Sequence, residues 1–106
     1  MLKKIRVMPD YGCYPVWLYD EDGLVIDTLM PEELRGTELD SKFEDLQARY
    51  DALFINTEKE FSYSGFNSSE EKERFLTDWQ AAYDELEQAI DGRYPITNEI
   101  KLSFPD

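Results

Sequence analysis

Two stretches of the sequence repeat apolar residues at the spacing of an α-helix. In residues 39–54 the steps are four, three, four and three, at Leu39, Phe43, Leu46, Tyr50 and Leu53. In residues 68–91 a second set follows the same rule, at Phe75, Trp79, Ala82, Tyr83, Leu86 and Ile90. Each set predicts a helix with a single apolar face. Such a face must be buried against another layer of structure, so the two helices constrain the whole fold.

Local signals predict where these helices begin and end. Ser68, with Glu71 three residues later, has the pattern of a capping box at a helix start. Gly92 suits the position after a helix end, because glycine adopts a left-handed backbone at little cost. Residues 31–34 resemble a first helical turn, with Pro31 at its start and acids following, and Gly36 interrupts it.

The remaining segments predict strands. Residues 3–7 alternate basic and apolar side chains, and residues 14–19 are aromatic and β-branched. An acidic turn at residues 20–23 leads into residues 24–26 as the partner strand of a hairpin. Residues 55–67 read as irregular, with a possible short strand at 60–63. A last strand begins at Pro95, with Asn98 interrupting an apolar face formed by Ile96, Ile100, Leu102 and Phe104.

The predicted order is therefore βββ–α–α–β. We expect an α+β fold in which two amphipathic helices pack on one face of a small antiparallel sheet of about four strands. Residues 1–106 should form a single domain. High net charge can indicate disorder, but 42% hydrophobic and 14% aromatic residues argue for a folded chain.

The charge of the chain excludes several functional classes. Eleven Lys and Arg residues against 24 Asp and Glu give a net charge of −13. That balance disfavours nucleic acid and anionic membranes as partners, since both need basic surfaces.

The absence of histidine removes the Ser-His-Asp triad and histidine-ligated zinc. A single cysteine permits no internal disulfide, and no targeting or membrane-spanning segment is visible, so a cytoplasmic location is expected.

Candidate catalytic and metal sites in the sequence fail on spacing or surroundings. The turn at residues 20–23 lacks calcium-loop spacing, because Leu24 and Pro31 occupy ligand positions counted from Asp20. Cys13 has no histidine base, and nearby Asp10 disfavours its thiolate. The glycines are isolated rather than grouped in a phosphate-binding loop. We therefore expect no enzyme, no metal and no cofactor.

The distribution of acids points to a basic protein partner. Residues 10–51 hold twelve acids against three basic residues, and residues 75–92 hold five acids without Lys or Arg. Such a surface steers association with a positively charged protein. The candidate partner-binding residues form a first set and an alternative helical patch: Trp17, Tyr19, Asp20, Glu21, Asp22, Glu32 and Glu33, and then Asp84, Glu87 and Asp91. The competing interpretation is a structural or regulatory protein whose acidity serves solubility only.

Several short motifs resemble those of a group of small acidic bacterial proteins without an established activity. They stand at residues 10–12, 15–17, 22–23, 50–51 with Leu53, and 64–66. In size, acidity and helix–sheet layout the chain is also similar to immunity proteins of bacterial toxin systems. That similarity implies an antitoxin that binds and blocks a toxin domain, often a basic nuclease.

The net charge of −13 also bears on the oligomeric state. Repulsion between two such chains favours a monomer over a homo-oligomer.

Overall fold

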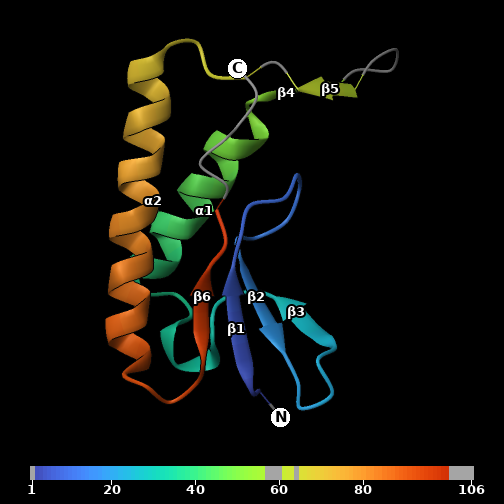
Figure 1. Ribbon diagram of the computed structural model, residues 1–106, viewed down its shortest axis with the longest axis vertical. Coiled ribbons are helices and arrows are strands. Elements are labelled where there is room, and N and C mark those ends of the chain that lie inside the picture. Colours follow the sequence, from blue (N-terminus) through green and yellow to red (C-terminus); the bar gives the residue numbers. More distant parts are fainter. Residues whose placement is uncertain (1, 57–60, 64, 101–106) are drawn as a thin grey trace.

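Four strands form the main sheet in the computed structural model of the chain, in the order β3-β2-β1-β6 (Figure 1). The structure describes residues 2–56, 61–63 and 65–100. The strands are β1 (Lys4–Val7), β2 (Val16–Tyr19), β3 (Val25–Thr28) and β6 (Ile96–Asn98). β2 runs antiparallel to both β1 and β3, as predicted for the hairpin, with Ile5 opposite Leu18.

The predicted α+β fold is confirmed, with one difference in the sheet. β6 lies parallel to β1, with Ile5 opposite Ile96, so the sheet is mixed rather than entirely antiparallel. The physical reason is that the second long helix carries the chain back to the end of the sheet where β1 begins, and a returning crossover produces parallel strands (Figure 1). Leu102 and Phe104 of the predicted last strand lie outside the described residues.

The two helices, α1 (Glu38–Asp51) and α2 (Ser69–Ile90), are capped at their first turns. The side chain of Thr37 accepts a hydrogen bond from the backbone of Asp40, and that of Ser68 accepts one from Glu71. At the end of α2, Asp91 has a left-handed backbone with φ of 50°, and Gly92 follows with φ of 76°. The predicted turn at residues 31–34 is a 3₁₀ helix, η1 (Glu32–Leu34).

A two-stranded ribbon follows α1 and corrects the prediction of an irregular segment. β4 (Phe54–Asn56) pairs antiparallel with β5 (Phe61–Tyr63), so residues 55–56 are not irregular and α1 ends before residue 54. The prediction missed β4 because three-residue strands carry too little periodicity to identify them without their partner. The possible strand at 60–63 is confirmed for residues 61–63, and residue 60 lies outside the described part of the chain.

Both helices cover one face of the main sheet (Figure 1). Alternate residues of β1 and β2 point into this layer, and Ile5 and Val16 are fully buried. Phe43 of α1 and Trp79 of α2 meet edge to face, with ring centroids 6.5 Å apart. The indole N–H of Trp79 donates to the side-chain oxygen of Asn98 at 2.9 Å. The polar interruption in the last strand therefore supplies the acceptor that a buried tryptophan requires.

Candidate partner-binding surfaces

The five acids of residues 75–92 fall into two groups, those that pair with cations of α1 and those that do not. Asp78 and Glu85 face α1 and pair with its cations, Asp78 with Arg49 and Glu85 with Lys42, both at 2.8 Å. Sequence reasoning missed these pairs because their partners lie on the other helix. A cation on a facing helix therefore offsets part of the repulsion along α2.

The predicted helical patch is the group that forms no pair with α1. Asp84, Glu87 and Asp91 are exposed, and the described residues provide no ion pair to any of them. Gln80 donates to Asp84 at 2.9 Å, and the hydroxyl of Tyr83 lies 3.3 Å from a carboxylate oxygen of Glu87. These neutral contacts leave the negative charge of the patch in place.

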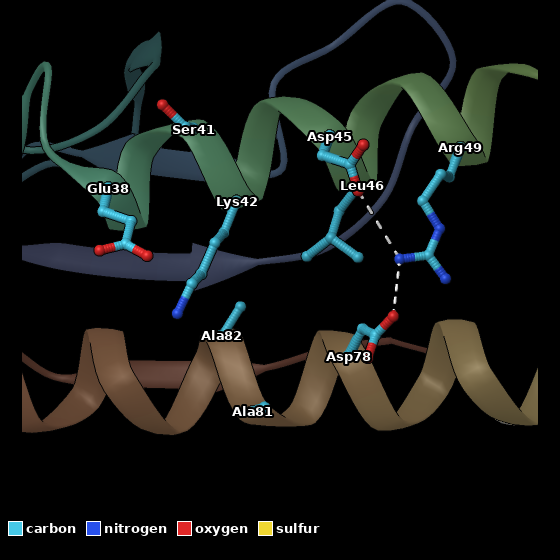
Figure 2. Close-up of a pocket in the computed structure, with 9 residues that line it drawn as sticks. All are labelled: Glu38, Ser41, Lys42, Asp45, Leu46, Arg49, Asp78, Ala81 and Ala82. Atoms are coloured by element: carbon cyan, nitrogen blue, oxygen red, sulfur yellow. Dashed lines mark hydrogen bonds and ion pairs between the residues drawn. The ribbon is translucent and has the colours of Figure 1, made fainter.

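A groove of about 460 Å³ runs between α1 and α2 (Figure 2). Its floor is apolar, formed by Leu46 and Ala82, and charged side chains line its walls. Arg49 crosses the groove, reaching Asp78 at 2.8 Å and Asp45 at 3.7 Å. Because ion pairs bridge the two walls, the groove carries little of the net negative charge and is a weak candidate for a basic partner.

The acidic turn at residues 20–22 joins β2 to β3 and is shaped by its own first carboxylate. One oxygen of Asp20 accepts hydrogen bonds from the backbone of Asp22 at 2.9 Å and of Leu24 at 3.0 Å. Gly23 has φ of +79°, a backbone conformation that side-chain-bearing residues rarely adopt. Asp20 thus holds the turn, and the side chains of Glu21 and Asp22 are exposed.

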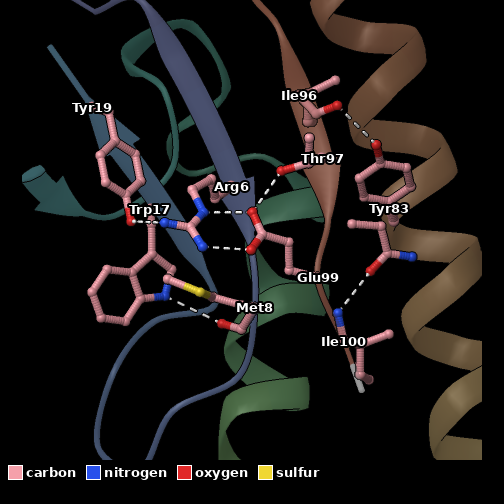
Figure 3. A network of polar contacts seen from close by, with 10 residues as sticks. Arg6, Met8, Trp17, Tyr19, Tyr83, Ile96, Thr97, Glu99 and Ile100 are labelled. Atoms are coloured by element: carbon pink, nitrogen blue, oxygen red, sulfur yellow. Dashed lines mark hydrogen bonds and ion pairs between the residues drawn. The ribbon is translucent and has the colours of Figure 1, made fainter. Parts of the chain in front are cut away.

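The two predicted aromatic residues lie on the sheet face away from the helices (Figure 3). Trp17 is half-buried, and its indole N–H donates to the backbone oxygen of Met8 at 3.2 Å. Tyr19 is only 8% exposed, because the guanidinium of Arg6 lies 5.4 Å from the centre of its ring and donates to its hydroxyl at 3.2 Å. Trp17 thus retains more ring surface for a partner than Tyr19.

An ion pair between Arg6 and Glu99 lies beside Tyr19 on this face (Figure 3). The guanidinium binds both carboxylate oxygens, and the hydroxyl of Thr97 donates to the same carboxylate at 2.8 Å. The Arg6 hydrogen bonds are the main reason that the pKa of Glu99 falls to about 2, against the opposing effect of burial. Sequence reasoning missed the pair, because only the parallel strand β6 brings residue 99 beside residue 6.

Positive charge borders the acidic turn on one side. A hollow of about 340 Å³ is lined by basic and acidic side chains together with Tyr19 and Gly23: Lys3, Lys4 and Arg6, and Asp20 and Glu21. The surface around the turn is therefore acidic toward β3 and mixed toward β1. The sequence could not predict this difference in charge between the two sides of the turn. It depends on the order of the strands, in which β2 lies between β3 and β1.

The third acidic group, Glu32 and Glu33, lies in η1. Glu33 pairs with Arg93 at 2.9 Å, which ties η1 to the segment after α2 and offsets one of its charges. Glu32 is exposed. Along the longest axis of the molecule, η1, the turn after β2 and the C-terminal end of α2 all lie toward the same end (Figure 1). The three elements that carry the predicted acidic residues therefore lie toward the end of the molecule at which β1 begins, and we call this the acidic end.

Some of the motif residues that carry the bacterial resemblance meet at the C-terminal end of α1. The backbone N–H of Gly12 donates to Asp51 at 2.9 Å, and the ring of Tyr11 contacts Phe54 edge to face at 5.2 Å. Gly12 has φ of +71°. These contacts fasten the long β1–β2 loop to the helix layer, so these motif positions serve the fold.

The surroundings of Cys13 bear on its reactivity. Burial is the first cause that raises the pKa of Cys13, and the charges of Asp10 and Asp51 raise it further, so the thiolate is disfavoured as predicted. Within residues 2–56, 61–63 and 65–100, no three potential ligand side chains are grouped to hold a metal ion. In the same ranges, no helix has the length and apolar character to cross a membrane.

One comparison with known proteins identifies the family. The sequence model of a family described as Serratia CdiI immunity protein-like matches residues 3–98, which span every helix and strand of the described structure. No curated protein matches the chain. A match over nearly the whole chain shows that the chain belongs to the Serratia CdiI immunity protein-like family.

Proposed function

We propose that this chain blocks a basic, nuclease-type toxin domain by direct contact through its acidic end. Its family makes it an immunity protein, which inhibits a toxin of contact-dependent inhibition. To this we add three points: the toxin domain is basic, it acts on nucleic acid, and the turn at residues 20–22 makes the first contact. The inhibitor needs no catalysis and no cofactor, and we place it in the cytoplasm as a monomer.

The position of three elements with exposed carboxylates toward one end of the molecule carries this proposal. A nuclease holds its substrate through basic groups that contact phosphates. Carboxylates accept the same charge-assisted hydrogen bonds from Lys and Arg as phosphates do. A protein with a net charge of −13 also attracts a basic domain over a distance and thereby raises the association rate.

Among the acidic groups, the turn is the strongest candidate for contact. Glu21 and Asp22 are exposed, and the half-buried ring of Trp17 lies on the adjoining strand. Tryptophan beside charged groups is typical of the residues that dominate binding energy. The patch at the end of α2 remains the alternative.

Two matched triple variants test the proposal. The first neutralises the turn, with Asp20→Asn, Glu21→Gln and Asp22→Asn. The second neutralises the α2 patch, with Asp84→Asn, Glu87→Gln and Asp91→Asn. Each removes three negative charges, and the amides retain the oxygen acceptors that Leu24 and Tyr83 contact. The probe is the toxin domain encoded at the same locus, and the measurements are association rate against salt and residual nuclease activity.

We expect the turn variant to associate about tenfold more slowly than the parent at low salt, and the difference to shrink as salt screens the charges. The α2 variant should associate nearly at the parent rate. Equal slowing by both variants would mean that only net charge matters. Unchanged association with both, or a parent that leaves the toxin active, would contradict the proposal and favour acidity as a solubility device.

A further inference from the structure

Three neighbouring residues carry an apolar surface that the fold leaves uncovered. Leu24 is 64% exposed, Val25 48% and Ile26 49%, and within the described ranges these are the exposed large hydrophobic side chains. A regular strand over a helix layer buries every second side chain. Here three consecutive residues stay in solvent, so neither face of the segment is covered.

This segment also lies at a free edge of the sheet. β3 is the terminal strand in the order β3-β2-β1-β6, and among the described residues it is hydrogen-bonded to β2 alone. Its pairing with β2 shifts between Leu18 and Tyr19, which leaves Ile26 as the extra, unpaired residue. Figure 1 shows β3 on the side of the sheet remote from α2. A free edge presents unpaired backbone N–H and C=O groups to any strand that approaches.

The charges around the edge select the kind of strand that can bind there. The acidic turn precedes the apolar residues, and Asp27 follows them within β3. If two copies of the chain paired antiparallel through β3, the turn of each would lie beside Asp27 of the other. Parallel pairing would place turn beside turn. Like charges meet in both cases, so the edge resists a second copy and accepts a positively charged strand.

We propose that the toxin domain docks an extended segment along the free edge of β3. Backbone hydrogen bonds would continue the sheet, apolar side chains would cover Leu24, Val25 and Ile26, and Lys or Arg residues at its ends would meet the turn and Asp27. This inference rests on the proposed function and adds the surface and the chemistry of the contact. It assigns binding to residues outside the acidic sets.

The test removes the apolar surface and leaves every charge in place. The edge variant combines Leu24→Ser, Val25→Thr and Ile26→Thr, in which threonine retains β-branching and strand propensity. The control combines Ala48→Ser and Ala81→Ser, two exposed apolar positions on the helices. Each is titrated with the toxin domain encoded at the same locus, and amide hydrogen exchange of residues 24–28 is followed in the unmodified protein, free and bound.

We expect the edge variant to bind about tenfold to a hundredfold more weakly, the control to bind like the parent, and the β3 amides to exchange more slowly in the complex. Parent-like binding by the edge variant, or β3 exchange unchanged on binding, would overturn edge docking while the proposed function stands. A parent that does not bind the toxin domain would overturn both. If the edge variant fails to fold, the exchange measurement on the unmodified protein decides.

Discussion

The substitution Asn98→Leu tests whether the polar interruption in β6 supports the core. Periodicity alone favours leucine, since it would complete the apolar face of the strand. The structure predicts the opposite sign, because the side-chain oxygen of Asn98 accepts the indole N–H of Trp79 at 2.9 Å, and Trp79 is fully buried. The same oxygen accepts the backbone N–H of Ile100 at 3.3 Å, and the amide nitrogen donates to Gln80 at 3.1 Å.

The expected magnitude follows from two opposing contributions. An indole N–H left buried without an acceptor costs about 1–3 kcal/mol. A leucine at this half-buried position gains roughly 1 kcal/mol, about half the value of a fully buried side chain. We therefore expect Asn98→Leu to lower the free energy of unfolding by about 0–2 kcal/mol, although leucine completes the apolar face, measured by urea denaturation followed by circular dichroism at constant m-value.

A double-mutant cycle with Trp79→Phe isolates the hydrogen bond from the change in packing. Phenylalanine has no N–H, so in that background Asn98→Leu should cost much less, and the coupling energy should be about 1–2 kcal/mol. If Asn98→Leu proves more stable than the parent, or the coupling energy is close to zero, the assignment of Asn98 as a required acceptor is wrong.

Two further predictions concern charge. The pKa of Glu99 is depressed from 4.5 to about 2, so its stabilising effect is fully present above pH 4.5 and disappears as the pH falls toward 2. The side chain is 31% exposed and therefore partly screened by solvent. We expect Glu99→Gln to lower the free energy of unfolding by about 1–2 kcal/mol at pH 7. Urea denaturation should show that this loss vanishes near pH 2. A cost independent of pH would contradict this. The second prediction concerns self-repulsion of the net charge. Raising NaCl from about 0.01 M to about 0.15 M shortens the Debye length from about 30 Å to about 8 Å, so salt screens repulsion across a molecule 40 Å long. Tm should therefore rise by about 4 °C or more. A constant or falling Tm in a thermal scan would show that self-repulsion is negligible.

Elements specified by nearby residues could be predicted from the sequence. The start of α2 follows from two hydrogen bonds. The side chain of Ser68 accepts from the backbone of Glu71, and the side chain of Glu71 accepts from the backbone of Asn67 at 3.3 Å. Its end follows from Gly92 after a left-handed Asp91. In each case the signal and its partner lie within four residues, so the chain needs no tertiary context to express it.

Features that join distant segments could not be predicted. The parallel direction of β6 depends on where α2 returns the chain, and the Arg6–Glu99 pair depends in turn on that direction. The pairing of Arg49 with Asp78 needs the two helices side by side. For the candidate site, the sequence named the charged and aromatic residues, but only the fold shows that Tyr19 is mostly covered.

The combination of features at β3 bears on whether the acidity serves binding or only solubility. Acids for solubility work at any exposed position, and they work best where they separate copies of the chain. An exposed apolar strand edge is a liability for a protein that only needs to stay soluble, since such edges pair with one another. Here the acidic turn and Asp27 stand at both ends of Leu24, Val25 and Ile26, so they block copies of the chain and leave the edge open to a basic strand. Solubility explains the acids at this edge, but it does not explain why the apolar residues are retained between them, whereas partner binding explains both.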